Sequence, residues 1–125
     1  MDALAGLERE LQPGLPCTDA FRLVRAFAEA LAVGQADPKR GSNDIYWAAW
    51  HAGAWADGSP CPELADWGSE FLQLADALDQ YAGQVRATAT LHELIRDAAI
   101  AVGKGLPLPN WRSTTRGVER DAPDR

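Results

Sequence analysis

The side chains best suited to chemistry lie in residues 45–56, a run with three tryptophans, a tyrosine and a histidine but no formally charged residue. At about 100° per residue, several of these share one helical face, with alanines and a glycine opposite. The members of this face are Trp47, Trp50, His51 and Trp55. Such a face can stack on a base or cation, line a ligand pocket together with Trp67, or anchor a protein contact. The simpler interpretation, which the pattern alone favours, is that the indoles fill a core, with at least one of them near the surface so that its N–H finds a partner.

Two histidines and two cysteines are the remaining candidates for catalysis or metal binding. His51 and His92 can act as general bases near neutral pH, and Cys17 and Cys61 each precede a predicted helix. No triad, HExxH or CxxC motif surrounds them, and their spacings are unlike those of compact zinc sites. We therefore expect a protein that is not an enzyme, with no catalytic residue, no metal and no cofactor. Both cysteines are expected to be buried, reduced thiols.

A second signal is electrostatic. Residues 41–84 contain seven acidic residues and neither lysine nor arginine. Six of the acids are candidate contact residues for a partner: Asp57, Glu63, Asp66, Glu70, Asp76 and Asp79. Three of them, Glu63, Asp66 and Glu70, recur at i, i+3 and i+7 and form what we call the acidic stripe. The simpler interpretation is a solvated face that keeps the protein soluble. The functional interpretation is a docking surface for a basic protein, including imitation of a nucleic-acid backbone.

Composition limits the classes of function. The chain has 125 residues and a net charge of −6, which argues against direct binding to nucleic acid. It has no run of roughly 20 apolar residues that could span a membrane, and its first residues lack a secretory h-region. The sequence therefore predicts a cytoplasmic protein with reduced cysteines. Two lysines against ten arginines, with abundant alanine, are typical of GC-rich bacterial or phage genes.

Helix signals dominate the chain, and they predict an all-α fold. We expect a compact bundle of four to five helices in one domain, residues 1–105, followed by an extended, partly disordered segment, residues 106–125. Ser42 is the expected N-cap of the tryptophan-rich helix, and Thr90 with Glu93 forms an expected capping box. Gly83 is expected to separate the last two helices. The predicted helices cover residues 2–12, 18–33, 42–56, 62–82 and 91–103.

These patterns favour a small protein that binds another macromolecule, as a regulator, an inhibitor or an accessory subunit. The acidic residues are the expected contact with a protein partner that has a basic surface. The alternative is a bundle that binds a small molecule in a pocket lined by the tryptophans and His51. A homodimer through helix 42–56, on its alanine and glycine side, is compatible with either function.

Overall fold

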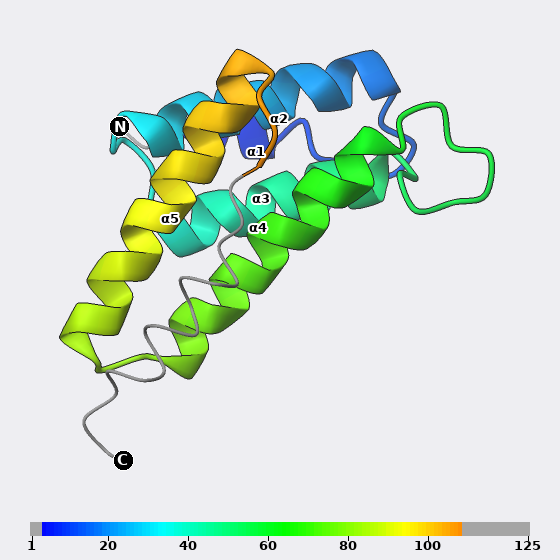
Figure 1. The fold of residues 1–125 in the computed structure, drawn as a ribbon. Helices are drawn as coiled ribbons and strands as arrows, with labels where there is room; N and C mark the ends of the chain where they lie inside the picture. Colours follow the sequence, from blue (N-terminus) through cyan, green and yellow to red (C-terminus); the bar gives the residue numbers. More distant parts are fainter. Residues whose placement is uncertain (1–3, 109–125) are drawn as a thin grey trace.

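The computed structural model describes residues 4–108 and confirms the all-α bundle (Figure 1). Its elements are α1 (Ala5–Glu8), α2 (Cys17–Ala32), α3 (Pro38–His51), α4 (Glu63–Gln80) and α5 (Val85–Lys104), and no strand occurs within the described residues. Helix α1 is much shorter than the predicted helix 2–12. The tail predicted for residues 106–125 falls mostly outside the described residues, and within them Leu108 packs partly buried against the core.

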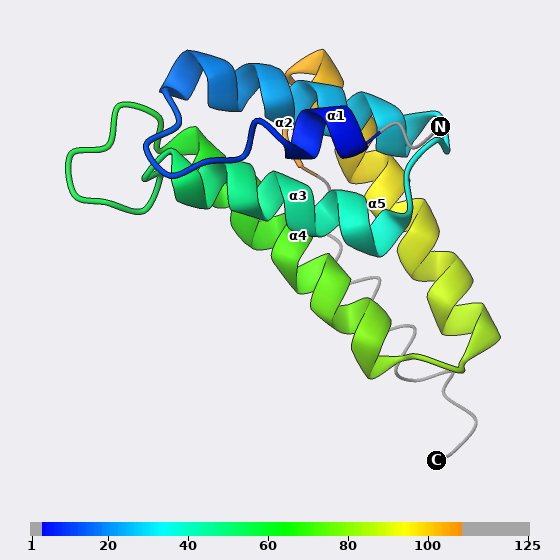
Figure 2. The same ribbon diagram turned by 180° about the vertical axis from the view of Figure 1, so that it is seen from behind.

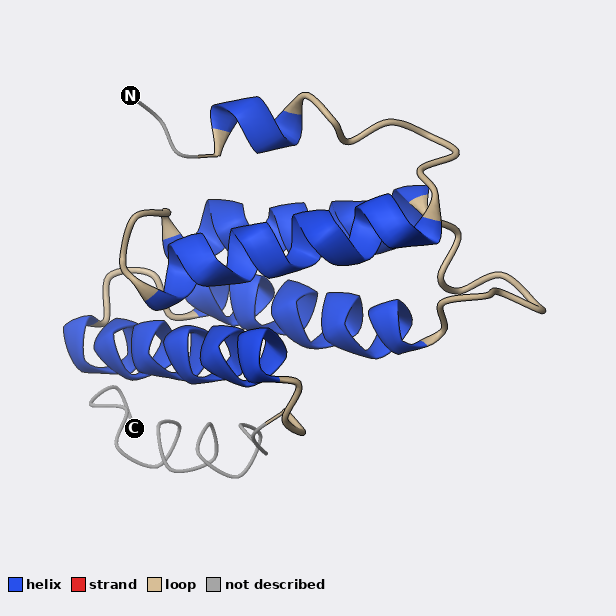
Figure 3. Cartoon of the chain, turned by 90° about the horizontal axis from the view of Figure 1, so that it is seen from above, coloured by secondary structure: helices blue, strands red, loops and turns tan. Residues whose placement is uncertain are grey.

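Helix α3 packs most extensively on α4, and α2 lies against both α3 and α5. Figure 2 shows α1 and the connector after it running along the outer side of α2 and α3. Seen from above, α1 forms a separate outer layer (Figure 3). No helix within residues 4–108 has both the length and the apolar character needed to cross a membrane.

The core is built from the apolar faces of the four long helices, whose 3–4 spacing favours burial on one side. Helix α3 contributes one large residue, Ile45, together with Ala48 and Ala49. The largest fully buried side chains include Leu23, Phe27, Ile45, Leu64, Phe71, Leu74, Leu91 and Ile95.

Helix α3 begins four residues before the predicted start at Ser42. Asp37 is the N-cap, and its carboxylate accepts a hydrogen bond from the backbone N–H of Arg40 at 2.9 Å. Pro38 occupies the first helical position, where a missing N–H costs nothing. Ser42 is instead buried inside the helix. The predicted helix 42–56 left Asp37 and Pro38 outside, although an Asp-Pro pair is a strong signal for the start of a helix.

Helix α3 also ends earlier than predicted. Gly53 has a φ of +70°, and the N–H of Ala54 donates to the carbonyl of Ala49 at 3.1 Å. This is a Schellman ending, which reverses the chain direction after His51. Residues 52–62 therefore form a loop that extends beyond the end of the bundle in Figure 1. Trp55, predicted on the helix, lies in this loop.

The predicted break at Gly83 is confirmed, with a φ of +88° between α4 and α5. The predicted capping box is wrong, because α5 already begins at Val85. Thr90 lies inside the helix, where its hydroxyl donates to the carbonyl of Arg86 at 3.1 Å. A threonine hydroxyl that donates to the backbone carbonyl of residue i−4 has a hydrogen-bond partner and does not end the helix.

The prediction of two reduced thiols is wrong. Cys17, the first residue of α2, and Cys61, just before α4, form a disulfide with a Cα–Cα distance of 6.0 Å. The two residues are 44 positions apart, so local sequence gives no sign of their pairing. The fold brings them together because the loop of residues 52–62 returns to the start of α2. The bond thus fixes the base of the loop that carries Trp55.

Candidate functional site

Five ring-bearing side chains at the end of α3 and in the following loop form one cluster, which we call the aromatic patch. Its members are Tyr46, Trp47, Trp50, His51 and Trp55. The three indole residues are 44%, 54% and 40% exposed, in sequence order. The interpretation of these tryptophans as core residues is therefore wrong. Soluble proteins rarely expose several indoles together. Large exposed apolar patches often mark contact sites.

The indoles face solvent because the opposite side of α3, which carries alanines, packs into the bundle. A Cβ added to Gly68 of α4 would lie 3.0 Å from the Cβ of Ala49, closer than real Cβ atoms normally come. Only small residues permit this approach of α3 to α4, as the sequence predicted for the alanine side. That side is consequently occupied within the chain, and the aromatic side is left for other contacts.

Trp55 is held against the bundle although it lies in a loop. The same Cβ on Gly68 would lie 2.9 Å from Cη2 of the Trp55 indole, so the ring packs directly on this glycine. Ala54 and Cys61 are buried on either side of the exposed part of the loop. The turn at Gly53 and the disulfide at Cys61 thus fix both ends of the segment, and the patch has a defined shape.

Three rings of the patch lie in mutual contact and form what we call the aromatic triangle, Tyr46, Trp50 and Trp55. Their centroids are 5.5 Å apart for Tyr46–Trp55, 6.1 Å for Trp50–Trp55 and 6.3 Å for Tyr46–Trp50. The other two rings extend the patch sideways. Trp47 and Tyr46 form a T-shaped pair with their ring centroids 5.1 Å apart. His51 stacks on Trp47 with the centroids 5.9 Å apart and 27° between the ring planes.

The backbone of the patch is tied to the N-terminal connector. The carbonyl of His51 accepts hydrogen bonds from the N–H groups of Gly14 and Leu15, each at 3.1 Å. These bonds satisfy a carbonyl that the end of a helix leaves open. The connector after α1 therefore crosses the end of α3 and supports the histidine end of the patch.

The predicted acidic residues do not form one surface. Asp79 of α4 pairs with Lys39 of α3, with 2.6 Å between its carboxylate and Nζ. This hydrogen bond is the main cause of the raised pKa of Lys39, and the negative charge of Asp79 raises it further. Asp76 lies near this pair and contributes to the same effect, so both residues belong to the α3 side of α4. Asp57 is exposed in the loop.

The acidic stripe lies on a different flank of α4. Glu63 and Glu70 are placed at i−4 and i+3 from Trp67, whose ring contacts Phe21 of α2 edge-on at 5.7 Å. The stripe thus flanks the α2 side of the helix, away from Lys39. Glu63 and Asp66 stand in the first turn of α4, where the helix dipole stabilises negative charge. Their position therefore has a structural explanation that needs no partner.

Trp67 is half-buried on α2 and does not join the aromatic patch, so the predicted pocket of all four tryptophans and His51 is not assembled. A shallow groove that was not predicted from the sequence includes Phe21, the residue that Trp67 contacts. Among the residues that the structure describes, its lining comes from α2: Thr18, Phe21, Arg22, Arg25, Ala26 and Glu29.

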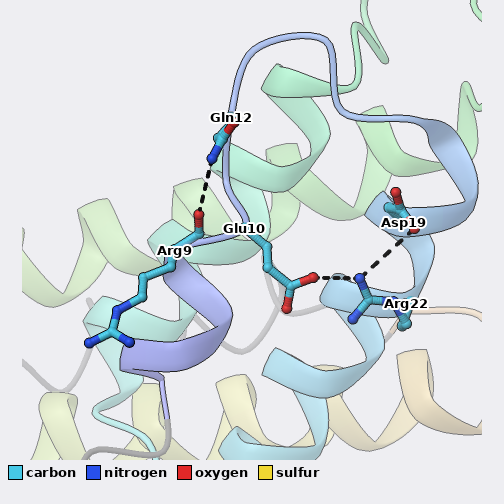
Figure 4. Close-up of polar contacts among 5 residues, drawn as sticks. All are labelled: Arg9, Glu10, Gln12, Asp19 and Arg22. Carbon is cyan, nitrogen blue, oxygen red and sulfur yellow. Dashed lines mark hydrogen bonds and ion pairs between the residues drawn. The ribbon is translucent and has the colours of Figure 1, made fainter.

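One charged residue of this groove, Arg22, is engaged within the chain. Arg22 contacts Glu10 at 2.6 Å and Asp19 at 3.9 Å (Figure 4). The hydrogen bond from Arg22 to Glu10 is the main cause of the raised pKa of Arg22. The same view shows Gln12 donating to the carbonyl of Arg9 at 3.5 Å, a contact within the connector. The Arg22–Glu10 pair attaches the connector to α2.

The set of histidines and cysteines considered for zinc does not come together. The two cysteines are bonded to each other, His51 stacks in the aromatic patch, and His92 is exposed on α5. Within residues 4–108, no group of three or more acidic, histidine or cysteine residues has a geometry that could hold a metal ion. Comparisons with protein-family models, curated proteins and solved structures found no match.

Proposed function

We propose that this chain is a non-enzymatic protein-binding module and that the aromatic patch is its contact surface. The observation that carries the proposal is the exposure of Trp47, Trp50 and Trp55 as one contiguous cluster. Tryptophan is enriched among the few residues that dominate the binding energy of protein interfaces. We assign to the patch the role that the sequence first suggested for the acidic residues, three of which have structural roles: Glu63 and Asp66 lie in the first turn of α4, and Asp79 pairs with Lys39.

The rigidity of the patch supports the same function. Trp55 packs on Gly68, the loop that carries it is closed by a disulfide, and the end of α3 is fixed by the N-terminal connector. Side chains that are already ordered lose little conformational entropy when a partner binds. A fixed, exposed set of indoles therefore pays a smaller ordering cost on binding than a flexible one.

The disulfide bears on where the module works. Disulfides persist in oxidising compartments and are rare in the cytosol of mesophiles. We propose that the chain acts in an oxidising compartment, in place of the cytoplasmic location expected from its sequence. Labelling of free thiols in intact cells tests this. Cys17 and Cys61 should resist a maleimide mass tag until a reductant is added, and immediate labelling of both would contradict it.

Site-specific crosslinking in the native cell tests the binding function. We would replace Trp47 with p-benzoylphenylalanine and, as a matched control, Val85, which is 83% exposed at the start of α5. The proposal expects a discrete adduct with one protein from position 47 and none from position 85. Identical adducts from both positions, or no adduct from position 47, would contradict it.

The crosslinked protein, once identified and purified, permits a quantitative test. Trp50 is 54% exposed, contacts Tyr46 and Trp55 within the patch, and is not part of the buried core. The Trp50→Ala variant should weaken binding by about 2 kcal/mol if this residue is a hot spot, roughly thirtyfold in Kd. A change of less than twofold, with the Val85→Ala control also unchanged, would place the contact elsewhere.

A further inference from the structure

We infer that the aromatic triangle receives a cationic side chain of the protein partner, arginine above all, stacked on its exposed rings. The inference rests on the proposed function and specifies the chemistry of the partner. It joins two observations: three aromatic rings with close mutual spacing, and a long surrounding segment of chain whose formal charges are all negative.

The spacing of the rings suits a single cation. The centroids of Tyr46, Trp50 and Trp55 are 5.5–6.3 Å apart. A charge seated over the middle of such a triangle lies within about 6 Å of all three centroids, the range in which the ring quadrupoles attract cations. One partner side chain can therefore come within reach of all three rings.

The orientation of the rings favours a planar cation. The planes of Tyr46 and Trp50 are only 24° apart, whereas Trp55 is tilted by 46–50° to both. A guanidinium can stack parallel to the exposed Trp50 ring and still present its edge to the tilted indole. Lysine carries the same charge as a strongly hydrated point without a stacking face. The geometry thus favours arginine over lysine.

The charges around the triangle favour a cation over an apolar or acidic group. Residues 41–84, which include the whole patch and all of α4, contain acids but neither lysine nor arginine. The two basic residues of α3 lie before this segment and are engaged: Lys39 pairs with Asp79 and Arg40 with Glu8. Asp57 lies exposed in the same loop as Trp55, and the net charge of −6 adds a long-range attraction for a positive side chain that approaches the patch.

Titration with matched peptides tests the inference on the intact protein. The probes are capped tetra-arginine, tetra-lysine and tetra-citrulline, the last having the shape of arginine without its charge. Binding is followed through the tryptophan indole N–H signals by NMR. We expect tetra-arginine to bind, tetra-lysine to bind more weakly, and tetra-citrulline to bind about tenfold more weakly or not at all.

Variants separate ring contacts from general charge attraction. Trp50→Ala should weaken tetra-arginine binding by about two- to fivefold, the effect of an exposed cation–π contact, whereas Trp50→Phe should retain most of it. Val85→Ala is the control and should bind as the parent does. Because Trp50 is half-exposed, its replacement should leave the helical circular dichroism spectrum unchanged, which verifies folding.

Each contrary result has its own meaning. Equal binding of tetra-arginine to the parent and to Trp50→Ala would mean that the acids alone attract the peptide, and the inference would be overturned. Equal binding of tetra-citrulline, or no binding of any peptide, would also overturn it. The protein-binding function would still be decided separately by the crosslink from position 47, which does not depend on the chemistry of the partner.

Discussion

Gly68→Ala is the substitution that most directly tests how α3, α4 and Trp55 fit together. Gly68 is buried in α4 at the closest approach of the two helices. A Cβ there would lie 3.0 Å from the Cβ of Ala49, 2.9 Å from Cη2 of Trp55 and 3.4 Å from its Cζ2. The alanine contact is the harder one to relieve, because a Cβ moves only with its backbone. The indole can swing away, but only by leaving its place in the patch.

Two opposing effects set the magnitude. Replacing glycine by alanine inside a helix stabilises it by about 1 kcal/mol, whereas an extra methyl in a well-packed core costs about 1–3 kcal/mol. We therefore expect Gly68→Ala to lower the free energy of unfolding by about 0–2 kcal/mol. Gly103→Ala is the matched control, since Gly103 lies in α5 and a Cβ there has no neighbour within 4 Å. That variant should be stabilised by up to about 1 kcal/mol.

Urea unfolding of both variants, compared with the parent, measures the difference. Helix propensity largely cancels between them, so Gly68→Ala should be less stable than Gly103→Ala by about 1–3 kcal/mol. The indole fluorescence of Gly68→Ala should also change, because Trp55 is displaced. If Gly68→Ala were as stable as Gly103→Ala and kept the parent's spectrum, the close packing of α4 on Ala49 and Trp55 would be refuted.

Three further perturbations test other parts of the structure. Replacing Cys17 and Cys61 together by alanine should lower the free energy of unfolding by about 2–4 kcal/mol, because the disulfide closes a long loop in the unfolded chain and so limits its conformations. An unchanged urea midpoint would argue against the disulfide. Asp79→Asn should return the pKa of Lys39 toward 10.5, since Asp79 raises it, and NMR titration of Nζ would detect this. The stabilisation from the pair is present below the unfolded pKa and is lost as pH rises through the higher folded pKa, so the variant should lose stability near neutral pH and match the parent at strongly alkaline pH. Converting the acidic stripe to amides should change the free energy of unfolding by less than about 1 kcal/mol, because relieved repulsion offsets the lost helix-dipole interaction. It should also reduce the salt dependence of tetra-arginine binding, and a loss of the Trp50 contribution in this variant would show that the stripe is part of the contact.

The helices could largely be predicted from the sequence because helix patterns are local. The helix over residues 62–82 and the break at Gly83 require only local spacing and one glycine, and both predictions are confirmed by α4, Glu63–Gln80, and by the positive φ of Gly83. The ends were less predictable because two start signals competed. Asp37 and Ser42 are both good N-caps, and only Asp37 is followed by a proline at the first helical position. For α5 the true start carries no such signal, because its N-cap Gln84 makes no side-chain cap hydrogen bond, and the prediction therefore followed Thr90.

The side of α3 that faces solvent could not be predicted from its own residues. Both sides of this helix are apolar, so periodicity within it gives no direction. The deciding feature is Gly68, in the next helix, which lets the alanine side approach more closely than an indole side could. The disulfide depends in the same way on a contact distant in sequence. Local spacing cannot reveal a pairing that forms only when the loop of residues 52–62 returns to the start of α2.

The aromatic patch and the acidic segment should contribute to binding in different ways. Exposed ion pairs are typically worth less than about 1 kcal/mol, whereas a central indole at an interface can be worth more than about 2 kcal/mol. Charges act over a Debye length and chiefly raise the rate at which a basic partner finds the surface. Loss of acids should therefore slow association, and loss of Trp50 should accelerate dissociation. The partner most favoured by this arrangement has an arginine that the acids attract and the rings retain.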